Sequence, residues 1–206
     1  MAPEKTKQRP VVDMTLVLRT CNADMISTNG FIWPASGPVE CPDWSPEATC
    51  GHGLHGLRWG EGDGGLLSWD PDAKWLVVEV ATGSIVDLAG KVKFPRGEVI
   101  HCGDQLSATS YLLSRAPGHA CVGAAVVAGH RGTATAGYRG TATAGHYGTA
   151  TAGYEGTATA GYRGTATAGD EGTATAGDSG AATAGHYGTA TAGYEGTVTA
   201  GYGGTL

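Results

Sequence analysis

Residues 136–159 read AGYRGTATAGHYGTATAGYEGTAT, which is one eight-residue unit repeated three times in direct succession. The unit recurs without insertion from residue 128 onward, because a glycine stands at every eighth position from Gly129 to Gly201. Such constant spacing is typical of a stacked array in which every unit has the same geometry. Two Gly and the Thr residues of each unit disfavour an α-helix, and eight is not a helical period. The repeat therefore predicts a solenoid of β-strands.

Threonine and alanine alternate strictly within each G-T-A-T-A-G segment. Successive side chains of a strand point to opposite faces, so Thr133 and Thr135 share one face while Ala134 and Ala136 share the other. The Gly-x-x-Gly segment, which has two positions without a Cβ, predicts the corner between strands. With methyl groups inside, the interior is narrow, which favours a flattened coil of two units per turn with parallel rungs about 4.7 Å apart. A three-sided coil of three units per turn is the alternative.

The bulky apolar residues lie in the first half of the chain. All five Trp and both Phe precede residue 100, whereas seven of the eight Tyr follow residue 137. Only the first half has side chains large enough for a conventional core. We expect a mainly β protein with a polar lead-in over residues 1–10, a small α+β head over 11–117 and a parallel β-solenoid over 118–206.

Several segments of the head show the pattern of a secondary-structure element. Short apolar, β-branched runs between Gly and Pro turns predict strands, and an apolar stripe after Ser and Thr caps predicts a helix that Pro117-Gly118 ends. The frequent Pro and Gly of residues 37–56 predict a loop. The strands are expected at 11–20, 74–80, 84–88 and 98–102, and the helix at 107–116.

The repeat unit resembles the octapeptide A-G-Y-G-S-T-x-T of bacterial ice-nucleation proteins. Ala136, Gly137, Tyr138, Thr141 and Thr143 match that pattern, as do their equivalents in several other units. The resemblance covers residues 128–206 and departs from the pattern where Gly-Ser is replaced by x-Gly. The corner tyrosine is also replaced in some units, by His130, His146, Asp170, Asp178 and His186. The resemblance implies a β-solenoid with outward T-x-T rows and association along tyrosine ladders.

The outward threonines are one candidate functional surface. Pairs about 7 Å apart along a strand and about 4.7 Å apart between rungs form a flat lattice of hydroxyl and methyl groups, as in ice-binding solenoids. The alternative is that threonine merely suits an exposed strand position. The candidate ice-binding residues are Thr133, Thr135, Thr141, Thr143, Thr149, Thr151, Thr157 and Thr159.

The corners and the last rung are a second candidate surface. Exposed aromatic rows and an uncovered strand edge both favour a mating surface, although stacking that stabilises the corners is the alternative. On this hypothesis the chain is a structural or interaction protein whose solenoid forms a homo-oligomer, expected to be a dimer, and positions the head. Ice binding and an enzymatic head are the other two hypotheses. The candidate oligomerisation residues are Tyr138, Tyr154, Tyr162, Tyr194, Tyr202 and Leu206.

The head contains two further candidate sites. Cys41, Cys50, His52 and His55 are residue types that bind zinc, with Cys21 or Cys102 as additional ligands, but their spacing is equally typical of buried thiols and a structural histidine. No other cofactor is expected. The head also resembles small uncharacterised domains of actinobacteria and their phages and, more distantly, ADP-ribosyltransferase folds. That resemblance implies a nucleotide site that uses His55 with Glu79 or Glu98, although no catalytic motif accompanies these residues.

Charge and hydropathy limit the partners. The net charge of −6 comes without a basic stripe, so no nucleic-acid partner is expected. No apolar run approaches the roughly 20 residues that span a bilayer, and no apolar segment of a signal peptide follows the N-terminus. We therefore expect no membrane partner and a cytoplasmic location, with a phage particle as the alternative. The five cysteines are expected to be reduced.

Overall fold

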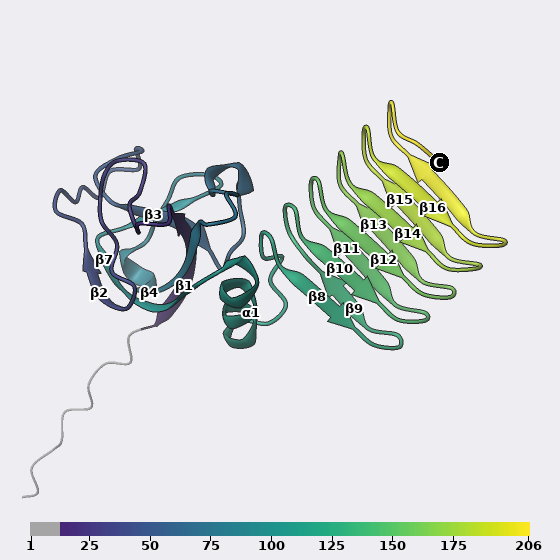
Figure 1. The fold of residues 1–206 in the computed structure, drawn as a ribbon, viewed down its shortest axis with the longest axis horizontal. Coiled ribbons are helices and arrows are strands. Elements are labelled where there is room, and N and C mark those ends of the chain that lie inside the picture. The colour runs from purple at the N-terminus through teal and green to yellow at the C-terminus, as the bar shows by residue number, and fades with distance from the viewer. Residues whose placement is uncertain (1–12) are drawn as a thin grey trace, which may run out of the picture.

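The computed structural model describes residues 13–206 and contains a globular head followed by a regular stack of strands (Figure 1). The predicted lead-in over residues 1–10 lies outside the described residues. The head contains one α-helix, two short 3-10 helices and seven strands. Their bounds are β1 Met14–Cys21, β2 Gly37–Glu40, β3 Leu54–Arg58, η1 Gly64–Leu66, β4 Lys74–Ala81, η2 Thr82–Ser84, β5 Val86–Asp87, β6 Val92–Phe94, β7 Arg96–Gly103 and α1 Gln105–Arg115.

The seven head strands form one antiparallel sheet in the order β2-β7-β4-β1-β3-β6-β5. Its central strands β1 and β4 are buried on both faces. One face packs against α1 through Leu18, Val77 and Leu112. The other face carries a second apolar cluster that includes Val17 and Phe94. The head is thus a three-layered α+β domain whose sheet lies between the helix and the long loops.

The prediction of a loop over residues 37–56 is wrong at both ends. Strand β2 pairs with β7, and β3 pairs with both β1 and β6. Strand β6, between Val92 and Phe94, was also not predicted. These strands are short and contain Gly, Pro or charged residues, so only their sheet partners reveal them. Pro38 is tolerated because β2 is an edge strand.

The helix and the remaining strands lie close to their predicted positions. Helix α1 begins two residues earlier than predicted, because Asp104 is its N-cap and accepts a hydrogen bond of 2.7 Å from the backbone N–H of Ser107. Strand β5 is only Val86–Asp87, because residues Thr82–Ser84 form a 3-10 turn. Strands β1, β4 and β7 overlap the predicted strands.

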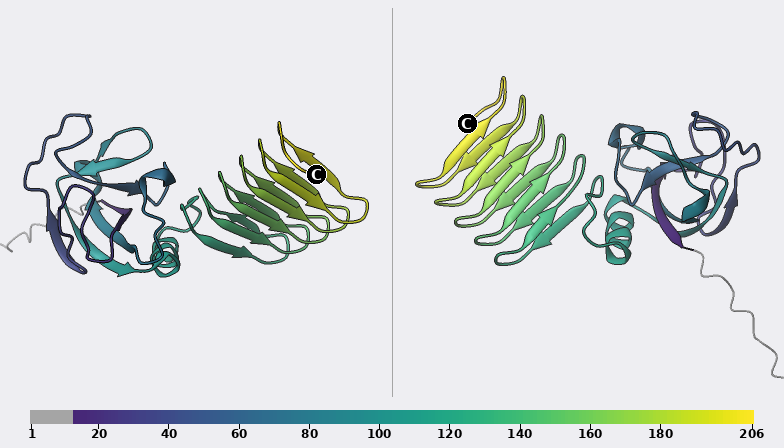
Figure 2. Two further views of the ribbon diagram at one scale, coloured as in Figure 1. Left: turned by 45° about the horizontal axis from the view of Figure 1, so that its top comes forward. Right: turned by 180° about the vertical axis from the view of Figure 1, so that it is seen from behind.

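The C-terminal strands form a two-sided parallel solenoid, as Figures 1 and 2 show. Thr141 pairs with Thr157 and Thr149 pairs with Thr165, so each turn contains two units and the three-sided alternative is wrong. The even-numbered strands form one five-stranded sheet and the odd-numbered strands form the other. The strands are β8 Ala125–Ala128, β9 Thr133–Thr135, β10 Thr141–Ala144, β11 Thr149–Ala152, β12 Thr157–Ala160, β13 Thr165–Ala168, β14 Thr173–Ala176, β15 Ala181–Ala184, β16 Thr189–Ala192 and β17 Thr197–Ala200.

The alanine methyl groups fill the space between the two sheets, as predicted. Ala142, Ala150 and Ala158 are completely buried in this cluster. A larger inward residue occurs only at the first and last turns, where Val126 and Val198 are partly buried. The interior is therefore one methyl layer from each sheet, and the backbone ladder bonds provide much of the remaining cohesion.

The corners differ from the prediction in which residue takes the left-handed backbone conformation. The second variable residue does so, as at Glu155 with φ 51° and Arg163 with φ 53°. The repeated glycines are needed for close packing instead. A Cβ at Gly153 would lie 2.8 Å from the carbonyl carbon of Gly137 in the preceding turn. The turns thus stack too closely at their corners to admit a methyl group.

The head covers the first turn of the solenoid. Cys121, Val122 and Ala124, which connect α1 to β8, are buried in the cluster that contains the helix. The backbone N–H of Val122 donates to the carbonyl of Gly60 at 2.9 Å. Across the join, the rings of Trp69 and Tyr138 have centroids 5.6 Å apart. Head and solenoid therefore share a continuous apolar contact.

A Val substitution at Ala158 is expected to lower the free energy of unfolding by about 1–3 kcal/mol, because the two extra methyl groups overpack a closed interior. Chemical denaturation followed by circular dichroism measures the change. The matched control is Ala200→Val in the last turn, where the inward side is only half-buried. If both variants lost the same free energy of unfolding, the conclusion that alanine methyl groups fill the interior would be contradicted.

Candidate functional site

The outward faces of the two solenoid sheets carry regular columns of threonine. On the even-numbered sheet the columns are uninterrupted from β10 to β16, while β8 has Ala125 and Val127 in the equivalent places. On the odd-numbered sheet the columns run from β9 to β17, with Ala181 as a substitution in one column. Two flat T-x-T arrays therefore lie back to back across the alanine core.

The eight predicted ice-binding threonines are divided between these two faces. Thr141, Thr143, Thr157 and Thr159 lie on the even-numbered sheet, and Thr133, Thr135, Thr149 and Thr151 lie on the odd-numbered sheet. The same columns continue into later turns that the prediction did not include, and the eight-residue period was sufficient to locate them. The added residues are Thr165, Thr167, Thr173, Thr175, Thr183, Thr189, Thr191, Thr197 and Thr199.

The hydroxyls of the threonines on the solenoid strands have no protein partner among residues 13–206. Every side-chain hydrogen bond within the described solenoid joins corner residues, for example Arg139 to Glu155 at 2.7 Å. In β9 to β13 the first threonine of each strand is exposed and the second is half-buried, whereas in β14 to β17 the threonine at the second position is exposed. The hydroxyl groups are therefore left to bind water, in register from one turn to the next.

The predicted tyrosine column is divided between the two edges of the coil. Tyr138 and Tyr154 lie on one edge and stack with centroids 5.5 Å apart. Asp170 follows them and ends the stack, because its carboxylate accepts the backbone N–H of His186 in the next turn at 2.8 Å. Tyr202 is on this edge beyond that interruption.

The other edge has the same interruption. Asp178 lies between Tyr162 and Tyr194 and accepts the backbone N–H of Tyr194 at 2.9 Å. Tyr194 is 77% exposed, and Tyr202 on the first edge is 76% exposed. Most of the Leu206 side chain is exposed too. Tyr147 and Tyr187, at the second corner position, were not predicted as surface aromatics. The exposed rings therefore gather on the later turns and do not form one continuous ladder.

The head cysteines and histidines that were zinc candidates line a cavity but do not form a metal site. No group of three or more Cys, His, Asp or Glu side chains within residues 13–206 has a geometry for holding a metal ion. Cys41 donates to Asp43 at 3.0 Å, and His52 contacts the same carboxylate at 2.9 Å. Cys50 instead lies 3.1 Å from the ammonium of Lys91, which lowers the pKa of its thiol.

The proposed nucleotide site with His55 and a glutamate is not assembled. His55 lines the head cavity, but neither Glu79 nor Glu98 does so. Glu79 and Glu98 are instead paired opposite each other on β4 and β7. The cavity residue that the sequence analysis missed is Arg19, whose signal was its position as the single charge in the apolar run MTLVLRTC.

Comparison with known proteins gives a separate result for each half of the chain. Residues 15–114 match the family described as Domain of unknown function (DUF7666). An ice nucleation protein of Pseudomonas syringae is 47% identical over 106 residues, which is 50% of this chain and 9% of that protein. Another from Xanthomonas campestris pv. translucens is 43% identical over 109 residues, or 52% of this chain and 7% of that protein.

The repeats are similar to those of ice nucleation proteins. A third relative, the ice nucleation protein InaU of Pantoea ananas, is 44% identical over 103 residues and is covered over 10% of its length. The resemblance read from the octapeptide is thus confirmed, although this chain spans only a small part of each relative. No solved structure matches the chain. Among residues 13–206, no helix is long and apolar enough to cross a membrane.

In this ice-nucleation-like solenoid, Tyr154 is expected to titrate at an unusually high pH. Its hydroxyl donates to the carboxylate of Glu171 at 2.5 Å, which raises the pKa of Tyr154 to about 12. Because the fold raises this pKa, the contact stabilises the fold at pH values below the ordinary tyrosine pKa of about 10. That stabilisation is lost as the pH rises toward 12. Spectrophotometric titration, which follows the formation of tyrosinate, measures the pKa of Tyr154.

The Glu171→Gln variant should return the Tyr154 titration toward that of an ordinary tyrosine. Glu195→Gln is the matched control, since the equivalent place in the turn before Glu195 holds Asp178 and no tyrosine hydroxyl. An identical tyrosine titration in the wild type and in both variants would contradict the assignment.

Proposed function

We propose that the solenoid binds ice through its two threonine faces. The observation that carries this proposal is the pair of flat T-x-T arrays whose hydroxyls have no partner in the described protein. Hydroxyl and methyl groups recur at the strand spacing of about 4.7 Å and at about 7 Å along each strand. Such a surface holds a layer of water in fixed positions, and the similarity to ice nucleation proteins supports this use.

The rigidity of the coil supports the same proposal. Each threonine pair lies on a strand whose backbone is bonded to the turns on both sides, and the alanine layer behind it is closed. The array is therefore ordered before it meets ice, so little conformational entropy is lost on binding. The relatives are named for ice nucleation, but this chain matches only 9% of the length of the Pseudomonas syringae protein. We therefore propose ice binding as the activity.

Replacing threonine by leucine on one face should lower thermal hysteresis, because leucine removes the hydroxyls and breaks the flatness of the lattice. Replacing both faces should abolish it. Ice-affinity partitioning provides a second measurement. The residues to be replaced are Thr141, Thr143, Thr157 and Thr159 on one face, and Thr149, Thr151, Thr165 and Thr167 on the other.

The control for these variants is the corner substitution Glu195→Gln, which leaves both faces unchanged. Circular dichroism is used to verify that every variant retains the β-spectrum of the parent. Absence of thermal hysteresis in the parent chain would refute the proposal. A double-face variant as active as the parent would also refute it.

Self-association along the corner edges is a second candidate function. Tyr187 and Tyr202 are 65% and 76% exposed, lie on the same edge in neighbouring turns and have ring centroids 6.0 Å apart, so they form an exposed aromatic pair. Exposed aromatic groups of this kind are typical of contact surfaces between proteins. We propose that two copies of the solenoid pair through this surface, which would hold their heads at a fixed separation.

Light scattering of the full chain tests this second function. The variant with Tyr187→Ser and Tyr202→Ser should have a smaller molar mass than the parent, because it loses the aromatic contact. The double-face threonine variant is the control and should keep the parent mass. A parent that is monomeric at high concentration would remove self-association from consideration without affecting the ice-binding proposal.

A further inference from the structure

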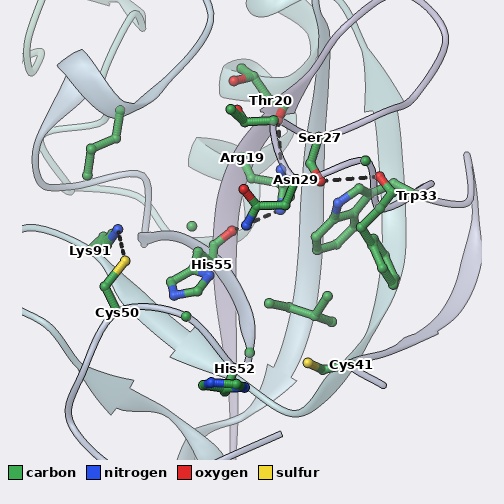
Figure 3. A pocket seen from close by; sticks show the side chains of 18 of the residues that line it. Arg19, Thr20, Ser27, Asn29, Trp33, Cys41, Cys50, His52, His55 and Lys91 are labelled. Carbon is green, nitrogen blue, oxygen red and sulfur yellow. Dashed lines mark hydrogen bonds between the residues drawn. The ribbon is translucent and has the colours of Figure 1, made fainter. Parts of the chain in front are cut away.

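The head contains a cavity of about 750 Å³ on the sheet face opposite the helix (Figure 3). Its floor is formed by β1 and β3, and its walls are formed by the loops around residues 27–33, 41–43 and 50–53 and by Leu66 and Leu67. The volume lies in the range of small-molecule sites, which are typically about 300–1,000 Å³. The cavity belongs to the part of the chain that matches the domain of unknown function.

Three residues of this cavity each have a buried nitrogen atom that lacks a hydrogen-bond partner in the described chain. Within residues 13–206, the only buried side-chain N or O atoms without a hydrogen-bond partner are Arg19 Nε, Trp33 Nε1 and His55 Nε2. All three residues line the cavity. A buried polar atom without a partner destabilises the fold, so three in one place indicate groups that are kept available for a ligand.

Arg19 is held rigidly at the centre of this group. Its Nη1 donates to the carbonyl of His55 at 3.3 Å and its Nη2 donates to the carbonyl of Thr20 at 3.0 Å. The guanidinium also lies over the Trp33 ring, 3.9 Å from the centroid. These contacts fix its position and leave N–H groups available, because a guanidinium has five. Figure 3 shows Arg19 between Trp33 and His55.

The positive charge of Arg19 is not neutralised by the described chain. No carboxylate of residues 13–206 lies within 4.0 Å of it, since their ion pairs are His52–Asp43, His119–Glu61 and Arg139–Glu155. Burial lowers the pKa of the Arg19 guanidinium. A buried cation without a counter-ion is costly, and an incoming anion would remove that cost.

A second cation lies at the same cavity. The ammonium of Lys91 contacts Cys50 at 3.1 Å on the opposite side of His55 from Arg19 in Figure 3. Burial lowers the pKa of His55, and the nearby charges of Lys91, Arg19 and Lys93 lower it further. His55 is therefore a neutral imidazole between two cations. The acidic residue of the lining, Asp43, is already bound to Cys41 and His52.

The remaining walls are apolar and partly aromatic. Phe31 packs edge-on against Trp33 with centroids 5.5 Å apart, and Leu54, Leu57 and Leu67 are buried around the floor. A ligand that satisfied only the cations would leave most of this surface empty. The walls therefore fit a molecule with a flat apolar body as well as a charge.

We propose that this cavity is a binding site for a small organic anion, in which a carboxylate or phosphate monoester binds Arg19 and Lys91 while a planar ring occupies the apolar walls. The anionic oxygens accept from the Nε–H of Arg19, and the His55 imidazole supplies a further hydrogen bond. Trp33 contributes its indole N–H. The proposal assigns no reaction to the site and does not depend on ice binding by the solenoid.

Isothermal titration calorimetry on the full chain tests the proposal with two matched pairs of probes. Adenosine monophosphate and adenosine differ only in the phosphate, and benzoate and benzamide differ in the charged group. We expect at least one anion to bind about tenfold or more tightly than its neutral counterpart, since charge-assisted hydrogen bonds are the stronger ones. The pair that discriminates tells a phosphate site from a carboxylate site. Inorganic phosphate alone should bind more weakly than the preferred anion.

The variant Arg19→Met should reduce the affinity for the preferred anion at least tenfold. Its control is Arg58→Met on β3, an exposed arginine outside the lining, which should leave the affinity unchanged. Lys91→Met is a second test that leaves the sheet core intact, and it should weaken the same anion while leaving the neutral counterpart unaffected. If Arg19→Met does not fold, the affinity of Lys91→Met for the anion decides the test.

Alkylation of Cys50 gives a readout that does not depend on heat of binding. Cys50 is the exposed cysteine of the described chain and lines the cavity, so the bound anion should slow its reaction with iodoacetamide. Peptide mass spectrometry measures the rate at this residue. Failure of all four probes to bind at millimolar concentration would overturn the proposal. Equal binding of charged and neutral probes, or equal effects of Arg19→Met and Arg58→Met, would also overturn it.

Discussion

The structure of the C-terminal half depends on one steric constraint, which is that its interior has room for a single methyl group per inward position. Ala142, Ala150, Ala158 and their equivalents bring the two sheets together at the shortest distance that side chains allow. A small interior buries little apolar area per turn, so the backbone ladders must provide much of the cohesion. That requirement explains the exact repetition, because any insertion would break the register of every later turn. It also explains the glycine corners, where a Cβ would strike the backbone of the turn before.

The same constraint produces the threonine faces. Because inward and outward positions alternate along a strand, fixing alanine inside at every second residue fixes the outward residues at the strand spacing. Those residues are then free to vary without affecting the interior, yet nearly all of them are threonine. Their hydroxyls make no bond to the described protein, and their flatness comes from the parallel ladders behind them. The surface is therefore as regular as the core, and its regularity is the property that ice recognition needs.

The head follows different rules and has a different kind of site. Its core is built from large side chains on both faces of a twisted antiparallel sheet, and the loops on one face enclose a cavity. The polar groups of this cavity do not repeat along the chain. One buried arginine, one neutral histidine and one indole N–H come together there from separate segments. A periodic surface can recognise a periodic object, whereas a cavity of this kind recognises one small molecule. The chain thus combines two proposed binding surfaces with unrelated chemistry.

The sequence by itself determined the solenoid, its inward alanines, its outward threonines and its similarity to ice nucleation proteins. It could do so because each of these depends on contacts whose spacing is the repeat itself. The narrow interior favoured two units per turn, but only the tertiary structure decided between two and three units. It also decided that the threonines are shared between two faces and that Asp170 and Asp178 interrupt the tyrosine columns. It likewise decided the fold of the head, because strands β2, β3 and β6 are too short to be recognised without their partner strands. The head cavity joins Arg19 to Trp33 and His55, which lie more than ten positions away in the chain. Such long-range contacts have no period, so no local pattern in the sequence records them.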